Sequence, residues 1–84
     1  MEIKSFYKSQ LELAIAISEL LDSYYQNIIS ENVLVESINK IVDNNFSKII
    51  KGSEFTTVLQ QKCGKRRLGV VARILKLSGK ADLI

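Results

Sequence analysis

The residues best suited to bind a ligand are the basic side chains between Cys63 and Leu77, in the stretch CGKRRLGVVARILKL. If this stretch is a helix, with about 100° between successive residues, its basic residues share one edge. That edge, which we call the basic stripe, consists of Arg66, Gly69, Arg73, Lys76 and Lys80, with Lys65 close beside it. A row of cations on one helix edge suits an anion, so the sequence predicts a surface that binds nucleic acid or phosphate.

Two details of the stripe favour an external anion. Lys65, Arg66 and Arg67 lie in the first turn of the expected helix, where the macrodipole already favours negative charge, so each cation destabilises it by roughly a few tenths of a kcal/mol. A bound anion would relieve this effect. Gly69 costs about 1 kcal/mol relative to alanine inside a helix. Its missing side chain allows a phosphate, a backbone or a partner helix to come close, or serves tight internal packing.

The distribution of charge leaves the partner open. Residues 1–43 carry three basic and seven acidic side chains, a net charge of −4, whereas residues 44–84 carry nine basic and two acidic ones, a net charge of +7. Three interpretations of the stripe follow: a solvated helix face, a contact with nucleic acid, or a contact with an acidic protein. In the last case the protein docks on an acidic partner or pairs head-to-tail with another copy, through carboxylates such as Glu12, Glu19 and Asp22.

Catalysis has little support in the composition. The chain has no histidine, so the commonest metal ligand and general base is missing, and its four glycines lack the spacing of a phosphate-binding loop. Cys63 is expected to be a small buried hydrophobe rather than a nucleophile. The carboxylates on the first helix are expected to form a solvated strip rather than a metal or acid/base site. We therefore expect a non-enzyme without metal or cofactor.

Size and composition predict a single domain over residues 1–84. The hydrophobic fraction of 46% is at the upper end for a soluble domain, and so small a chain buries only part of its surface, which favours self-association. Ile15, on the charged side of the first helix, marks a possible contact between copies. The longest uncharged run, residues 23–30, is too short to span a membrane. With one cysteine and no secretory signal, a cytoplasmic protein is expected.

The spacing of apolar residues predicts an all-α domain of four helices, because it is helical throughout and there is no proline. A first helix over Ser5–Ile29 and a second that Ser30 caps form a long hairpin, which ends at Gly52. Ser53 caps a short third helix that ends at Gly64, Gly79 ends the fourth, and residues 80–84 fray. The expected apolar arc of the fourth helix consists of Leu68, Val70, Val71, Ala72, Ile74, Leu75 and Leu77.

The stretch TTVLQQKCGKRRLGVVARIL, from Thr56 onward, resembles a helix-turn-helix element. Its apolar, glycine and inward-facing positions are matched by Leu59, Cys63, Gly64 and Val70. The pattern departs from the motif at Gln60, Lys65 and Arg73. The resemblance implies that the last helix is the recognition helix, with Lys65, Arg66 and Gly69 nearest the nucleic acid. It also implies that Thr56, Thr57 and Gln60 lie near phosphates.

The layout of an acidic first helix followed by FTTVLQQKCGKRRL is similar to a family of small Firmicute proteins. These share a C-terminal phenylalanine-threonine and a glycine-lysine-arginine-arginine-leucine pattern. The resemblance implies a bacterial cytoplasmic protein and no particular activity.

Overall fold

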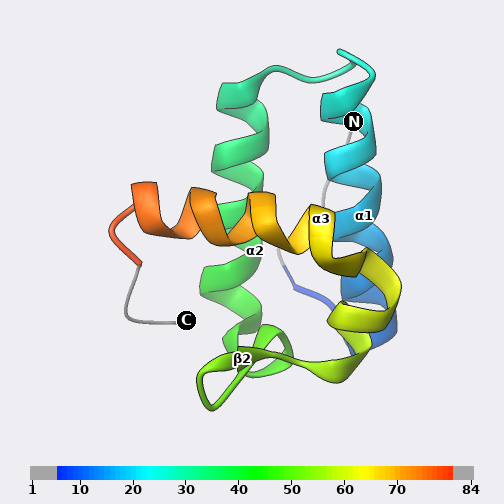
Figure 1. Cartoon of the computed structure of the whole chain (residues 1–84), viewed down its shortest axis with the longest axis vertical. Helices are drawn as coiled ribbons and strands as arrows, with labels where there is room; N and C mark the ends of the chain where they lie inside the picture. The colour runs from blue at the N-terminus through cyan, green and yellow to red at the C-terminus, as the bar shows by residue number, and fades with distance from the viewer. Residues whose placement is uncertain (1–5, 81–84) are drawn as a thin grey trace.

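The computed structural model describes residues 6–80, and its elements are three helices and one short hairpin (Figure 1). They are α1 (Gln10–Tyr25), α2 (Glu31–Ile49), β1 (Ile50–Lys51), β2 (Glu54–Phe55) and α3 (Thr57–Leu77). The helical class is confirmed, but the prediction of four helices is wrong. The expected third and fourth helices form one element, α3, which is interrupted at Gly64. No helix within residues 6–80 combines the length and apolarity needed to cross a bilayer.

The helix α1 is shorter than predicted. Ser9 caps its start by accepting a hydrogen bond from the Glu12 N–H at 3.1 Å, while the predicted start at Ser5 lies outside the described residues. At the other end Asn27 adopts a left-handed conformation, with φ 62°, and the Ile28 N–H donates to the Ser23 carbonyl at 2.8 Å. This Schellman arrangement stops the helix before Ile28. Ile28, which lies inside the predicted helix Ser5–Ile29, is therefore outside α1 and exposed.

The helix α2 begins as predicted, since the Ser30 hydroxyl accepts a hydrogen bond from the Val33 N–H at 3.2 Å. Near its end Asn45 has non-helical angles, φ −137° and ψ 29°, so the helix bends in the Asp-Asn-Asn segment, whose residues are weak helix formers. The buried side chain of Asn45 accepts from the Tyr7 N–H and donates to the Ile41 carbonyl, both at 2.9 Å. The bend thus ties the segment before α1 to α2.

The hairpin replaces the predicted cap at Ser53. Ile50 pairs with Phe55 and Lys51 with Glu54, and Gly52 has the left-handed φ of 67° that a tight connection requires. The cap position of α3 is occupied by Thr56, whose hydroxyl donates to the Lys48 carbonyl at 2.8 Å. The start of α3 is therefore anchored to the end of α2.

The two parts of α3 differ in direction because Gly64 has φ 80° and ψ 166°, a combination that side-chain-bearing residues rarely adopt. After this break, α3 crosses in front of both α1 and α2 (Figure 1). Leu68, Val71 and Leu75 are buried beneath it, as predicted, but Leu77 at the end of the arc is 82% exposed. Gly79, with φ 80°, ends the helix as predicted, because the Lys80 N–H donates to the Leu75 carbonyl at 2.7 Å. Apart from Lys80, the end expected to fray lies outside the described residues.

Candidate nucleic-acid interface

The part of α3 after Gly64 carries the basic stripe on the side opposite the core. Arg66, Gly69, Arg73 and Lys76 are exposed on it, and so is the neighbouring Lys65. The helix buries Leu68, Val71, Ile74 and Leu75 on its other side. Burial of this apolar side fixes the rotation of the helix, so the five exposed positions face solvent together.

Lys80, the last residue of the predicted stripe, is held by α2. Its Nζ donates to the Asn39 side-chain oxygen at 2.7 Å and forms an ion pair with Asp43 at 2.9 Å. The Schellman turn at Gly79 points this residue back toward α2, away from the exposed edge of α3. Lys80 therefore fastens the end of α3 to α2, and we leave it out of the interface proposed below.

The two arginines after Lys65 have different surroundings. Arg67 forms a bidentate ion pair with Asp22 of α1, with nitrogen to oxygen distances of 2.9 and 3.0 Å, and also donates to the Cys63 carbonyl at 3.1 Å. Its neighbour Arg66 lies over the ring of Tyr25, with its guanidinium carbon 5.4 Å from the ring centre, and stays exposed. Arg67, which the helical spacing leaves out of the stripe, thus turns toward α1, and Asp22 is paired with it instead of belonging to the expected solvated strip of carboxylates.

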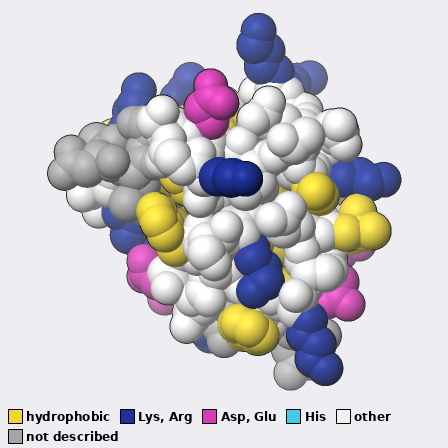
Figure 2. Space-filling model, turned by 90° about the horizontal axis from the view of Figure 1, so that it is seen from below, with side chains coloured by type: hydrophobic (Ala, Val, Ile, Leu, Met, Phe, Trp, Pro, Cys, Tyr) yellow, Lys and Arg dark blue, Asp and Glu magenta, His cyan; other side chains and the backbone are white. Residues whose placement is uncertain are grey.

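Two cations of the stripe, and Lys65 beside it, have no side-chain partner in the described residues. The side chains of Lys65, Arg73 and Lys76 make no hydrogen bond or ion pair with any residue between 6 and 80. Figure 2 views the end of the molecule that carries the hairpin, and it shows Lys and Arg side chains spread over this face and its rim among uncharged surface, hydrophobic side chains and some Asp and Glu side chains. These unpaired cations are available to an external anion.

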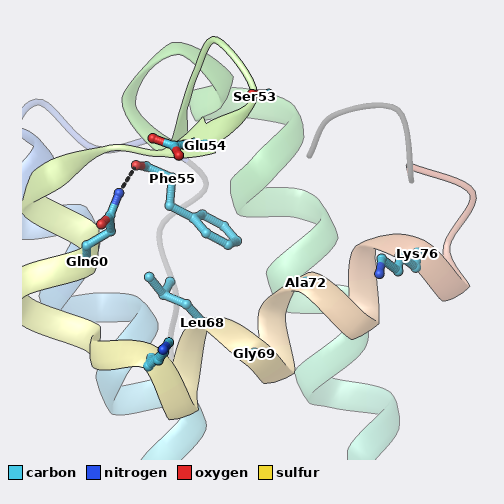
Figure 3. A pocket seen from close by; sticks show the side chains of 9 residues that line it. Ser53, Glu54, Phe55, Gln60, Leu68, Gly69, Ala72 and Lys76 are labelled. Carbon is cyan, nitrogen blue, oxygen red and sulfur yellow. Dashed lines mark hydrogen bonds between the residues drawn. The ribbon is translucent and has the colours of Figure 1, made fainter.

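A groove lies between the hairpin and α3, with a volume of about 670 Å³. We call it the α3 groove; it is lined by Ser53, Glu54, Phe55, Gln60, Lys65, Leu68, Gly69, Ala72 and Lys76. Figure 3 shows the side chains of Phe55 and Leu68 directed into the space between the two elements. The groove thus combines an apolar wall with lysines and small residues. The sequence does not predict this groove, because Gly52 and Ser53 fit a helix end and a helix cap as well as they fit the Gly-Ser loop of a hairpin, Ile-Ile-Lys-Gly-Ser-Glu-Phe.

Gly69 is not explained by internal packing. It is exposed in the α3 groove, its φ is not positive, and a Cβ built on it would meet no atom of residues 6–80 within 4 Å. Of the two interpretations of this glycine, tight internal packing is therefore not supported by any residue between 6 and 80. The other interpretation is that Gly69 lets an external molecule approach the helix closely.

The local geometry departs from a helix-turn-helix element. Gly64 alone is non-helical between the two parts of α3, whereas that motif has a turn of three to four residues. In addition, two of the three residues expected near phosphates use their side chains in hydrogen bonds within the protein. Thr56 is buried and donates to the Lys48 carbonyl, and the Gln60 amide donates to the Phe55 carbonyl at 2.6 Å (Figure 3). Thr57 is exposed.

The remaining chemically active groups sit apart from the stripe. Cys63 is buried, as predicted, and this burial raises the pKa of its thiol, although the Ser18 hydroxyl, which donates to Sγ at 3.4 Å, and Arg67 partly oppose the shift. Glu12 and Glu19 are exposed on α1. Within residues 6–80 no three cysteine or carboxylate side chains lie close enough to hold a metal ion.

Comparison with known proteins places the chain in a family. Residues 4–76 match a family described as conserved hypothetical protein, and since they are most of the 84 residues, the chain belongs to that family. The description assigns no activity. It is consistent with the resemblance to a family without a known role, but the Firmicute pattern and the helix-turn-helix resemblance are not confirmed. No curated protein and no solved structure matches the chain.

Proposed function

We propose that this protein is a non-enzymatic module that binds nucleic acid through the outward side of α3 after Gly64. The observation that carries the proposal is that Lys65, Arg73 and Lys76 are exposed on one side of one helix without a partner in residues 6–80. Gly69 lies between them and leaves room for a phosphate or sugar. Such cations contribute the sequence-independent part of nucleic-acid affinity.

The length of the cationic side favours a polymer over a single phosphate. Lys65 and Lys76 are eleven residues apart, which corresponds to roughly 16 Å along a helix at 1.5 Å per residue. One DNA strand presents a phosphate about every 3.4 Å along the helix axis, so this length covers several phosphates. After Gly64, α3 has no Asn or Gln to read adenine and no Ser or Thr, so its polar side chains can reach a base edge only through arginine or lysine at guanine. We therefore expect mainly phosphate contacts, with any base preference limited to guanine, and duplex DNA is the first ligand to test.

The sharpest variant test uses Gly69, because a side chain there enters the interface without disturbing the fold. Gly69→Glu and Gly69→Gln add side chains of the same size into open space, and each should raise the free energy of unfolding by about 0.5–1 kcal/mol through helix propensity. A carboxylate near phosphates is repelled, so Gly69→Glu should weaken binding to mixed-sequence duplex DNA at low salt about tenfold or more relative to Gly69→Gln. Fluorescence anisotropy measures both affinities, and equal affinities would remove α3 from the interface.

A further inference from the structure

A second feature of the molecule is an exposed apolar pair on α1 with carboxylates beside it. Leu11 and Ile15, one turn apart, are 46% and 45% exposed, although α1 buries its other side completely. Glu12 and Glu19 are exposed on the same part of the helix. We call these four residues the α1 outer face. An isolated exposed leucine is ordinary, but an apolar pair bordered by acidic groups has the composition of a helix that docks on a basic, partly apolar surface.

The α3 groove has the complementary composition. Its apolar wall is formed mainly by the half-buried Phe55, with the 6% of Leu68 that stays exposed, and its small residues Gly69 and Ala72 let a helix approach closely. Glu54, on the hairpin side, is the one acidic residue among the described residues that line it. Lys65 and Lys76 lie on the same helix, eleven residues apart, while Glu12 and Glu19 are seven apart on theirs. These separations are about three and two helical turns, so each pair keeps to one side of its helix.

We propose that the α3 groove binds the α1 outer face of a second copy of this chain. Leu11 and Ile15 would cover Phe55 and Leu68, and the two glutamates would meet the two lysines. The contact must form between molecules, because Leu13 and Ile17 are fully buried in the chain's own core and hold α1 in place. The proposal agrees with the opposite net charges of the two halves of the chain, −4 for residues 1–43 and +7 for residues 44–84.

The contact is heterologous, since the two surfaces that meet are different. When two copies pair, one still has a free α3 groove and the other a free α1 outer face. Further copies can bind there, so association continues into a closed ring or an open chain unless one of these surfaces is blocked. The α3 groove shares Lys65 and Lys76 with the proposed nucleic-acid interface. Association does not depend on nucleic acid, but the two partners compete for these lysines.

The test is complementation between two variants, followed by sedimentation velocity at low salt. Ile15→Lys with Glu19→Lys disables the α1 outer face, and Lys65→Glu with Lys76→Glu disables the groove. Like charges then oppose each other across the contact, so each variant alone should associate about tenfold more weakly than the unmodified protein, or worse. In an equimolar mixture the groove of the first variant and the α1 outer face of the second are both intact, and the two altered surfaces carry opposite charges, so the mixture should associate more strongly than either variant alone.

Controls distinguish loss of this contact from a general effect of charge, from unfolding, and from loss of nucleic-acid binding. Glu31→Lys with Glu36→Lys reverses two exposed charges on α2 and should leave association unchanged. Circular dichroism confirms that every variant stays helical, and a variant that unfolds is replaced by Ile15→Lys or Lys76→Glu alone. The proposal is overturned if the unmodified protein stays monomeric at all concentrations, or if the mixture associates no better than its components. The α1 variant should keep its affinity for DNA, so a failure of association leaves the proposed function standing.

Discussion

Replacing Leu75 by alanine is expected to lower the free energy of unfolding by about 2–5 kcal/mol. The side chain is fully buried beneath α3, where it helps to join this helix to α1 and α2. Small domains have a total stability of about 5–15 kcal/mol, so the variant should lose a large part of it. Urea unfolding followed by circular dichroism at 222 nm measures the change as a lower midpoint at an unchanged slope.

Leu77→Ala is the matched control for Leu75→Ala. It makes the same change on the same helix, but Leu77 is 82% exposed, so the free energy of unfolding should change by less than about 0.5 kcal/mol. Equal losses at the two positions would mean that α3 is rotated differently on its core. The exposed stripe would then have to be assigned again.

Gly64→Ala should destabilise the protein by about 1–3 kcal/mol, because the φ of 80° and ψ of 166° at this position are almost restricted to glycine. A Cβ there would meet no atom of the described residues within 4 Å, so the cost comes from the backbone and not from a clash. Thermal unfolding should show a lower midpoint, by about 4–8 °C for each kcal/mol lost.

Gly69→Ala is the control for this effect and should have the opposite sign. Gly69 lies in a regular part of α3 with open space around it, so alanine should stabilise the helix by up to about 1 kcal/mol. If Gly64→Ala also stabilises the protein, α3 is a continuous helix without a break. The later half of α3 would then not cross α1 and α2 as described.

Helical spacing and capping residues predicted much of the fold. Ser30 and Gly79 act locally, through hydrogen bonds to backbone groups a few residues away, so their roles can be inferred from sequence. Burial of Leu68, Val71 and Leu75 followed from their spacing. The same spacing leaves Arg67 out of the stripe, and in the structure Arg67 pairs with Asp22 of α1.

Features that depend on distant parts of the chain were not predicted. The end of α1 is a local exception: Asn27 supports a left-handed turn, but the apolar Ile28 and Ile29 continue the helical spacing, so the spacing predicts too long a helix. Lys80 belongs to the periodic stripe by spacing alone, but Asn39 and Asp43 of α2 hold it, and no local pattern reveals such partners. The α3 groove likewise needs the hairpin and α3 to come together in space.

The most direct test of phosphate binding by α3 is the salt dependence of its affinity for mixed-sequence duplex DNA. If Lys65, Arg73 and Lys76 each neutralise one phosphate, the logarithm of the association constant should fall with the logarithm of salt concentration with a slope of roughly −3. Arg73→Ala with Lys76→Ala should make this slope shallower by roughly two units. Lys8→Ala with Lys40→Ala removes the same charge from exposed positions outside α3 and should leave the slope nearly unchanged. A slope near zero, equal slopes for the two double variants, or no binding to duplex DNA, single strands or structured RNA at low salt would contradict the proposal.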